Sequence, residues 1–416
     1  MKALVFERSL PRFAASRLAS GLGSGRGAKV APLRLVDTEP PALPGEGWHR
    51  VTPLLSGICG SDLATIDGRS SRYFEPLVSF PFVPGHEVLG VVESAATGAG
   101  GTPLAAGARV VIQPVLGCVA RGLTPCASCR VGNTGDCEHT GFGHLAPGIQ
   151  TGFCADTGGG WSAAGLVAHE SQLYPVDDGL SDTDAVTVEP LACALHAVLH
   201  AGVGADDVVA VVGAGTLGLA VVAAVGHLTG QGALPLPRVL AVGARYANQR
   251  RLAEELGANA VVPPEQLGRA VRRHARSMVV GGAAGTRLTG GADVVFDCVG
   301  SSESIAASLD VVRPRGSVVL VGMPGRVHVD LAPLWHREVR LAGTYAYGTE
   351  VLEHGTRATF EVALEAAAAM RTGRLVSATY PLERFEEAVA HAGAAGRRGA
   401  VKIAFDLRSG ARGGRR

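Results

Sequence analysis

The sequence predicts an α/β protein in which a β-rich domain is joined to a domain built on a doubly wound parallel sheet. A chain of 416 residues exceeds what one hydrophobic core usually serves, so two domains are expected. Short apolar runs broken by Gly and Pro fill residues 30–176, which is typical of strands. After Val208, strand-like and helix-like segments alternate, which is typical of a parallel sheet covered by helices.

Composition narrows the class of partner. Hydrophobic residues make up 47% of the chain and charged residues 18%, as in a well-buried globular protein. The formal net charge is only +1, so nothing favours a nucleic-acid or membrane partner, and a small molecule is expected instead. The apolar run Met1–Phe6 is too short for a signal peptide, which predicts a cytoplasmic protein. Eight clustered cysteines then favour reduced thiols or metal sites over a disulfide framework.

The stretch Gly57–Asp62 places a thiol, a hydroxyl and a carboxylate in four residues, at Cys59, Ser61 and Asp62. Further along, an imidazole lies beside a carboxylate at His86 and Glu87. A second isolated acid, Glu189, opens an apolar, helix-like segment. A thiolate, an imidazole and a carboxylate form an acceptable ligand set for a catalytic zinc, which needs three protein ligands and one open position. The alternative is a buried cysteine, a hydrogen-bonded histidine and surface acids that never meet.

A second cysteine cluster lies between residues 118 and 137. It consists of Cys118, the C-x-x-C pair Cys126 and Cys129, and Cys137. Four thiolates around one zinc leave no open position, so this pattern predicts a structural zinc site. A thioredoxin-like redox pair would not explain the outer two cysteines, and a disulfide is the other alternative.

A dinucleotide fingerprint follows the buried strand Val208–Val212. The turn carries G-x-G-x-x-G, which lets the backbone approach a pyrophosphate at the N-terminus of the following helix. The next strand ends without the acid that would bind the ribose of NAD and is followed by an arginine, so NADP is favoured unless that arginine is only a solvated loop residue. Residues expected to bind the cofactor, including those at later strand ends, are Gly213, Gly215, Thr216, Leu217, Gly218, Gly243, Arg245, Val299, Val321 and Gly322.

Other segments are expected as follows. Residues 14–29, rich in Gly, Ser, Ala and Arg, predict a mobile surface loop. Residues 350–372 predict a long Ala-rich helix, residues 382–392 a shorter helix, and residues 400–405 a final strand. This tail is expected to rejoin the first domain.

The motifs GICGSD, PGHE, the four-cysteine segment, EPLA and VVGAGTLG occur in the order found in the zinc-dependent medium-chain dehydrogenases/reductases, which the chain resembles over nearly its whole length. The resemblance implies a GroES-like β-rich catalytic domain carrying both zinc ions, in residues 1–186 and 341–416, around a Rossmann domain in residues 187–340. It implies Cys59 and His86 as catalytic zinc ligands. The third ligand is Glu87 or Glu189, as in the sorbitol and threonine dehydrogenase branch, rather than Cys193.

The same resemblance assigns Asp62 to hold the His86 ring and Ser61 to pass the substrate proton outward. It implies hydride transfer between an alcohol or polyol and NADP(H), one catalytic and one structural zinc, and a homodimer or homotetramer. Two departures stand out. Seven residues separate Cys118 from Cys126 where the family usually has two, and Ala64 stands where many alcohol dehydrogenases carry a relay histidine.

Two other functions remain open from the sequence. One is a zinc-free quinone or enone reductase of the same superfamily, which would require the residues around Cys59 to be vestigial. The other is a non-catalytic NADPH-binding protein whose only zinc lies in the four-cysteine segment.

Overall fold

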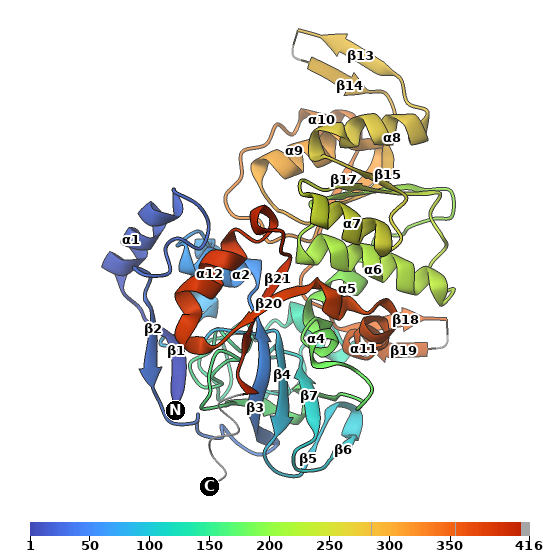
Figure 1. Cartoon of the computed structure of the whole chain (residues 1–416). Helices are drawn as coiled ribbons and strands as arrows, with labels where there is room; N and C mark the ends of the chain where they lie inside the picture. Colours follow the sequence, from blue (N-terminus) through green and yellow to red (C-terminus); the bar gives the residue numbers. More distant parts are fainter. Residues whose placement is uncertain (284, 354, 409–416) are drawn as a thin grey trace. The chain divides into compact units, whose positions relative to one another are not determined.

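The structure, a computed structural model, describes residues 1–283, 285–353 and 355–408 (Figure 1). The chain divides into two compact units. The first comprises Met1–Glu189, Tyr347–Thr349 and the described residues from Ala363 onward, and the second comprises Pro190–Ala346 and Glu350–Val362. The sequence predicted domain boundaries at 1–186, 187–340 and 341–416. This division into compact units does not test those boundaries, which stay a prediction.

A seven-stranded sheet forms the centre of the first unit. Its order is β20, β21, β3, β4, β7, β9, with β8 paired to β3, and every pairing is antiparallel except that of β20 with β21. The β-rich character predicted for this part of the chain is therefore confirmed. The strands are β3 (Trp48–Gly57), β4 (Val88–Val92), β7 (Arg109–Ile112), β8 (Leu166–His169), β9 (Leu173–Pro175), β20 (Val376–Tyr380) and β21 (Lys402–Asp406).

Smaller elements surround this sheet. Two separate two-stranded sheets are β1 (Lys2–Phe6) with β2 (Leu33–Asp37), and β5 (Ala96–Thr97) with β6 (Pro103–Leu104). The helices are α1 (Leu10–Ser20), α2 (Gly60–Ile66), α3 (Ala127–Arg130), α4 (Asp182–Ala185), α12 (Phe385–Gly393) and, beginning in the second unit, α11 (Thr359–Met370). Short 3-10 helices of this unit are η1 (Arg72–Leu77), η2 (Ala99–Gly101), η3 (Thr134–Asp136), η4 (Glu170–Gln172), η6 (Thr372–Leu375), η7 (Leu382–Arg384) and η8 (Gly396–Arg398), whereas η5 (Pro264–Gln266) belongs to the second unit.

The prediction of a mobile loop at residues 14–29 is wrong. Its first half belongs to α1 (Leu10–Ser20), and Ser16 is fully buried with its hydroxyl donating to the carbonyl oxygen of Ile66. Gly25 has a φ of +77° and lies against the backbone of α12, where a Cβ would collide. The small residues that suggested mobility are present because they allow close packing of backbone on backbone.

The second unit contains a six-stranded, fully parallel sheet in the order β12, β11, β10, β15, β16, β17. The predicted doubly wound sheet is thus confirmed. The strands are β10 (Val208–Val212), β11 (Val239–Gly243), β12 (Ala260–Val262), β15 (Ala292–Asp297), β16 (Val312–Leu320) and β17 (Arg340–Gly343). The helices are α5 (Val188–His200), α6 (Thr216–Gly230), α7 (Ala247–Glu255), α8 (Leu267–Ala275), α9 (Ser302–Val311) and α10 (Ala332–His336). Among the described residues, no helix is both long enough and apolar enough to cross a membrane.

Two hairpins in the second unit were not predicted. The first, β13 (Val279–Gly282) with β14 (Gly285–Leu288), projects away from the parallel sheet (Figure 1). The second, β18 (Thr349–Leu352) with β19 (Gly355–Ala358), occupies the start of the segment predicted as one helix from 350 to 372. That prediction is wrong in its first half, because β-branched residues and Gly355, with a φ of +118°, favour a hairpin over a helix.

Candidate functional site

Cys59 lies at the N-terminus of α2, just after the long central strand β3. Its backbone N–H donates a hydrogen bond of 2.9 Å to Oδ2 of Asp62, which lies in the first turn of the helix. The other carboxylate oxygen, Oδ1, lies 3.5 Å from Nδ1 of His86. Metal-binding histidines usually have their second ring nitrogen oriented by such a carboxylate. Asp62 is therefore placed where that role requires it.

His86 and Glu87 come immediately before β4, which runs antiparallel to β3. The backbone N–H of Gly57 donates to the carbonyl oxygen of Glu87 at 2.9 Å, which holds the two segments together. The donor atoms of Cys59, His86 and Glu87 consequently lie within 4.8 Å of one another. Only glycine fits at position 57, because a Cβ there would overlap the Glu87 carboxylate.

This group of three side chains has the chemistry and the burial of a metal site. His86 is 3% exposed and Glu87 is 1% exposed. A thiolate, an imidazole and a carboxylate are ligands that zinc accepts, and three protein ligands leave one position for substrate. Negative groups held away from water also require a compensating cation. The donor set therefore fits a zinc ion with an open position.

The electrostatics of His86 agree with this assignment. Burial lowers the pKa of His86, but the carboxylate of Asp62 and the thiol of Cys59 outweigh it and hold that pKa well above its ordinary value. The pocket thus favours a positive charge at this point, and a bound cation would supply one.

Glu189 lies in the first turn of α5, outside the group formed by Cys59, His86 and Glu87. It is 8% exposed, and the hydroxyl of Tyr347 donates to its Oε1 at 3.1 Å. Burial raises the pKa of Glu189 to about 7, with His86 opposing the shift and Glu87 adding to it. Glu189 is thus within electrostatic range of the group, and which carboxylate completes the metal coordination stays a prediction.

Sequence reasoning missed Lys402, the first residue of β21. Its ammonium forms an ion pair with Oε2 of Glu87, and it also donates to the carbonyl oxygen of Ile58 at 3.4 Å. Both charged side chains are 1% exposed. The sequence did contain a signal for this ion pair, since Lys402 is a single charged residue inside the apolar run that predicts the final strand. A charged side chain in a buried strand needs a partner of opposite charge.

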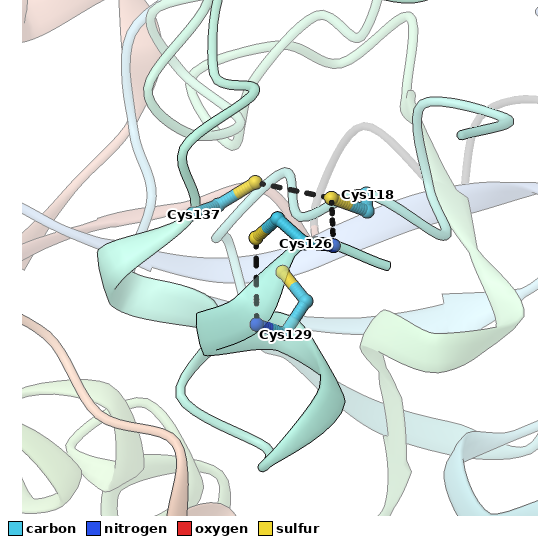
Figure 2. A group of neighbouring side chains, drawn as sticks. All are labelled: Cys118, Cys126, Cys129 and Cys137. Atoms are coloured by element: carbon cyan, nitrogen blue, oxygen red, sulfur yellow. Dashed lines mark hydrogen bonds between the residues drawn. The ribbon is translucent and has the colours of Figure 1, made fainter. Parts of the chain in front are cut away.

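The four-cysteine cluster forms as predicted, with the sulfur atoms turned toward one another (Figure 2). The sulfur atoms of Cys118 and Cys137 are 3.6 Å apart, and all four residues are free thiols. The N–H of Cys126 donates to the sulfur of Cys118, and the N–H of Cys129 to that of Cys126. N–H groups from Cys129 and Glu138 lower the pKa of Cys126 to about 6. Burial raises the pKa of Cys129 and Cys137, so a bound cation would be needed to hold these two as thiolates. Four converging sulfurs fit a closed, tetrahedral zinc site.

The seven residues between Cys118 and Cys126 fold partly inward. Val119 is exposed, but Arg121 is fully buried. The Arg121 guanidinium donates 3.0 Å hydrogen bonds to the carbonyl oxygens of Leu116 and Phe142, and a further one to that of Gly148. The insertion therefore supplies a cation that ties together the backbone around the cluster, a role that its sequence did not reveal.

The glycine fingerprint occupies the turn between β10 and α6. Gly213 has a φ of +92°, and a Cβ there would collide with the Val299 side chain. A Cβ on Gly218 would meet the carbonyl of Gly213, so the helix packs directly on the strand end. At Gly215, by contrast, a Cβ would meet open space, and no side chain caps the helix. The free N–H groups and open space at Gly215 fit a pyrophosphate.

The other predicted cofactor residues lie at the same edge of the parallel sheet. Thr216 and Leu217 begin α6, Gly243 ends β11, and Val321 and Gly322 both donate to the carbonyl oxygen of Asp297 at 2.9 Å. This is the carboxyl edge, where doubly wound sheets bind ligands.

Arg245 follows β11 with its side chain exposed. No hydrogen bond or ion pair to its guanidinium is found within the described residues. The Arg250 guanidinium, one turn into α7, donates to the carbonyl oxygens of Ala244 and Arg245 at 3.1 and 2.9 Å. A second cation, which sequence reasoning missed, thus lies beside the position where a 2′-phosphate would bind.

Two protein-family models match the chain. A model described as an alcohol dehydrogenase GroES-like domain covers residues 45–178, and a model described as a zinc-binding dehydrogenase covers residues 223–369. The first range contains Cys59, His86, Glu87 and the four-cysteine cluster.

Individual relatives agree with the family models. Sorbitol dehydrogenase from Arabidopsis thaliana is 29% identical over 344 residues, covering 79% of this chain and 84% of that protein. L-Idonate 5-dehydrogenase from Vitis vinifera is 30% identical over 324 residues, covering 76% of this chain and 78% of that protein. A solved structure described as a zinc-binding dehydrogenase from Sinorhizobium meliloti bound to NADP matches with a TM-score of 0.64 and 26% identity, covering 90% of this chain and 95% of that one.

Proposed function

Because the chain belongs to the zinc-dependent medium-chain alcohol and polyol dehydrogenase family and is an oxidoreductase, we propose that it transfers a hydride reversibly between a polyol and NADP(H). The buried group of Cys59, His86 and Glu87 carries this proposal, because it has the ligand types and the open position of a catalytic zinc site. That group also argues against a zinc-free reductase, which would have no use for it. A non-catalytic role is set aside by membership of a family of dehydrogenases.

In the proposed reaction, the alcohol carbon gives a hydride to the nicotinamide and the hydroxyl gives up a proton. The products are the carbonyl compound, NADPH and that proton. Bound zinc would supply Lewis acidity at the substrate oxygen. Cys59, His86 and one of the two glutamates hold the ion, Asp62 fixes the His86 ring, and Lys402 balances the charge of Glu87.

Ser61, in the first turn of α2, supplies the hydroxyl that accepts the substrate proton. With Ala64 in place of a relay histidine, the proton needs another path outward. The Thr65 hydroxyl lies one turn further, hydrogen-bonded at 2.9 Å to the carbonyl oxygen of Ser61 and at 3.0 Å to the hydroxyl of Ser70. Because the first of these bonds goes to the Ser61 carbonyl oxygen, a water molecule would be needed to carry the proton from the Ser61 hydroxyl to Thr65.

The preference for NADP rests on Arg245 and its neighbour Arg250, because a guanidinium suits a 2′-phosphate where NAD enzymes have an acid.

Two zinc ions per chain are proposed, one at Cys59 and one in the four-cysteine cluster. A cytoplasmic location and an assembly of two or four copies are proposed from the sequence and from the family resemblance alone. The substrate class follows the named relatives, which act on sorbitol and L-idonate.

The decisive test is Cys59→Ser, assayed with a panel of polyols and both cofactors. Turnover should be lost and zinc content should fall by one ion per chain, while NADP binding measured by calorimetry should be unchanged. Cys154→Ser, at a buried cysteine outside both clusters, is the matched control and should keep both zinc ions. Full activity in Cys59→Ser would overturn the proposal.

A further inference from the structure

A third cluster of metal-binding side chains lies in the second unit, apart from both predicted zinc centres. His196 and His200 are one turn apart on α5 and so lie on the same face of the helix. Glu350, in β18, reaches both of them. Its Oε1 is 2.8 Å from Nδ1 of His196, and its Oε2 is 3.4 Å from Nε2 of His200. The two imidazole rings have centroids 4.3 Å apart.

With both imidazoles neutral, the charge of this cluster is not balanced without a cation. The Glu350 side chain is 3% exposed, and a carboxylate held away from water requires a positive partner. Within the described residues, its ion pairs are with His196 and His200, and a histidine is charged only when protonated. Two protonated rings this close would repel each other. One divalent ion would satisfy the carboxylate and both neutral rings at once.

The distances fit ligands that share one ion. Metal bonds of about 2.0–2.1 Å to nitrogen and oxygen place neighbouring ligand atoms roughly 2.8 to 3.4 Å apart in octahedral or tetrahedral sites. The carboxylate-to-imidazole distances of 2.8 and 3.4 Å lie at the two ends of that range, and all three donors lie within 4.8 Å of one another. Small side-chain movements are therefore enough to complete the coordination.

The surroundings have the features of a prepared site. The Thr359 hydroxyl donates to Oε1 of Glu350 at 2.7 Å, and such a bond orients a ligating carboxylate. His196 is 15% exposed at its side chain, whereas His200 is 52% exposed. An ion can therefore enter from solvent on the His200 side, and water can fill the remaining coordination positions.

We propose that His196, His200 and Glu350 bind a third divalent transition-metal ion, of the class that accepts imidazole and carboxylate together, such as Zn²⁺. None of these residues belongs to the groups around Cys59 or Cys118. The ion would cross-link α5 to the β18–β19 hairpin. It would join α5, which carries Glu189 in its first turn, to the strand that follows Tyr347, so it would stabilise the two segments that carry Glu189 and its hydrogen-bond partner.

The test counts zinc per chain in the full-length enzyme by elemental analysis, after equilibration with micromolar Zn²⁺ and gel filtration. His200→Ala is the first variant, because its partly exposed ring can be removed without opening the core. His336→Ala, at an exposed histidine that ends α10, is the matched control. The expected result is one zinc fewer in His200→Ala than in wild type and no change in His336→Ala.

A second variant and a second measurement guard against misfolding. Glu350→Gln keeps the shape but removes the charge, and it should also lose one zinc. Added Zn²⁺ should raise the Tm of wild type and His336→Ala but not of His200→Ala, which keeps its alcohol dehydrogenase activity. Equal zinc contents in wild type and His200→Ala would overturn the third site. Because the Cys59→Ser variant reports on a different ion, that outcome leaves the proposed function standing.

Discussion

Lys402 and Glu87, separated by most of the chain, form a buried ion pair beside Cys59. The Lys402 ammonium meets Oε2 of Glu87, and each side chain is 1% exposed. Burial lowers the pKa of Lys402, but Glu87 and Cys59 outweigh it and raise that pKa, so the lysine stays charged. The pair balances the charge of Glu87, and which of Glu87 and Glu189 completes the zinc coordination stays a prediction.

Removing one partner of this pair should therefore be costly. Lys402→Met leaves the Glu87 carboxylate buried without its cation and should lower the free energy of unfolding by about 3–5 kcal/mol. Denaturant unfolding of the zinc-loaded enzyme measures this loss. The double variant Lys402→Met, Glu87→Gln removes both charges and should recover part of the stability. If the double variant lost as much stability as Lys402→Met and Glu87→Gln lose in sum, the two side chains would not be coupled through the ion pair.

The raised pKa of Glu189 predicts a pH dependence of stability. In the enzyme stripped of metal, burial raises the pKa of this carboxyl from 4.5 to about 7, so the folded state binds a proton that the unfolded state releases. The stability contributed by that proton is fully present below pH 4.5 and is lost as the pH rises through about 7. At 1.36 kcal/mol per pKa unit, the loss is about 3 kcal/mol.

Glu189→Gln isolates this contribution, because the amide does not titrate. The difference in unfolding free energy between wild type and Glu189→Gln should shift in favour of the variant between pH 4.5 and 7. Denaturant titrations of the two metal-free proteins at several pH values measure it. A difference that stays constant with pH would mean that Glu189 ionises as an ordinary surface acid.

Arg245 should decide which cofactor binds. Arg245→Ala removes a guanidinium from the expected position of the 2′-phosphate. Charged hydrogen bonds contribute about 1.5–3 kcal/mol, so the Kd for NADP should rise by roughly one to two orders of magnitude while that for NAD changes little. Calorimetric titration with each cofactor measures both. Arg251→Ala, on helix α7 shortly after Arg245 but paired with Glu255, is the control. Equal changes for both cofactors would refute a role in reading the phosphate.

Local sequence patterns predicted much of this fold, because the relevant forces act over short stretches. The strand Val208–Val212 and the glycine turn after it were predicted with correct bounds, because a continuous apolar run followed by closely spaced glycines is visible in adjacent residues. The four-cysteine cluster was predicted because ligand type and spacing together specify it. The prediction of a mobile loop at residues 14–29 failed, because glycine and serine allow close packing there, although elsewhere they are typical of mobile loops.

Partners distant in the sequence were less predictable. Lys402 meets Glu87 only because β21 pairs with the end of β3, a register that no local pattern contains. The cluster of His196, His200 and Glu350 depends likewise on a hairpin that was expected to be helix. The i, i+4 histidine pair was visible in the sequence, but its carboxylate was not. Long-range pairing therefore limits how far sequence alone can define such sites.

Arg121 should control how tightly the four-cysteine cluster holds its zinc. Its buried guanidinium donates to the carbonyl oxygens of Leu116, Phe142 and Gly148, which lie on either side of the cysteines in sequence. Arg121→Lys keeps the charge, but a single ammonium cannot span three carbonyl groups. Each carbonyl left without a donor should cost about 1–3 kcal/mol, so the cluster should open more often and release zinc faster.

Zinc release into a chromophoric chelator measures this effect, and using the Cys59→Ser, His200→Ala background leaves only the ion of the four-cysteine cluster to follow. Arg130→Lys, at an exposed arginine that ends α3 within the same segment, is the control and should release zinc at the unchanged rate. If Arg121→Lys released zinc no faster than Arg130→Lys, the inserted residues would be a passive loop, and the cysteines alone would determine the lifetime of the bound ion.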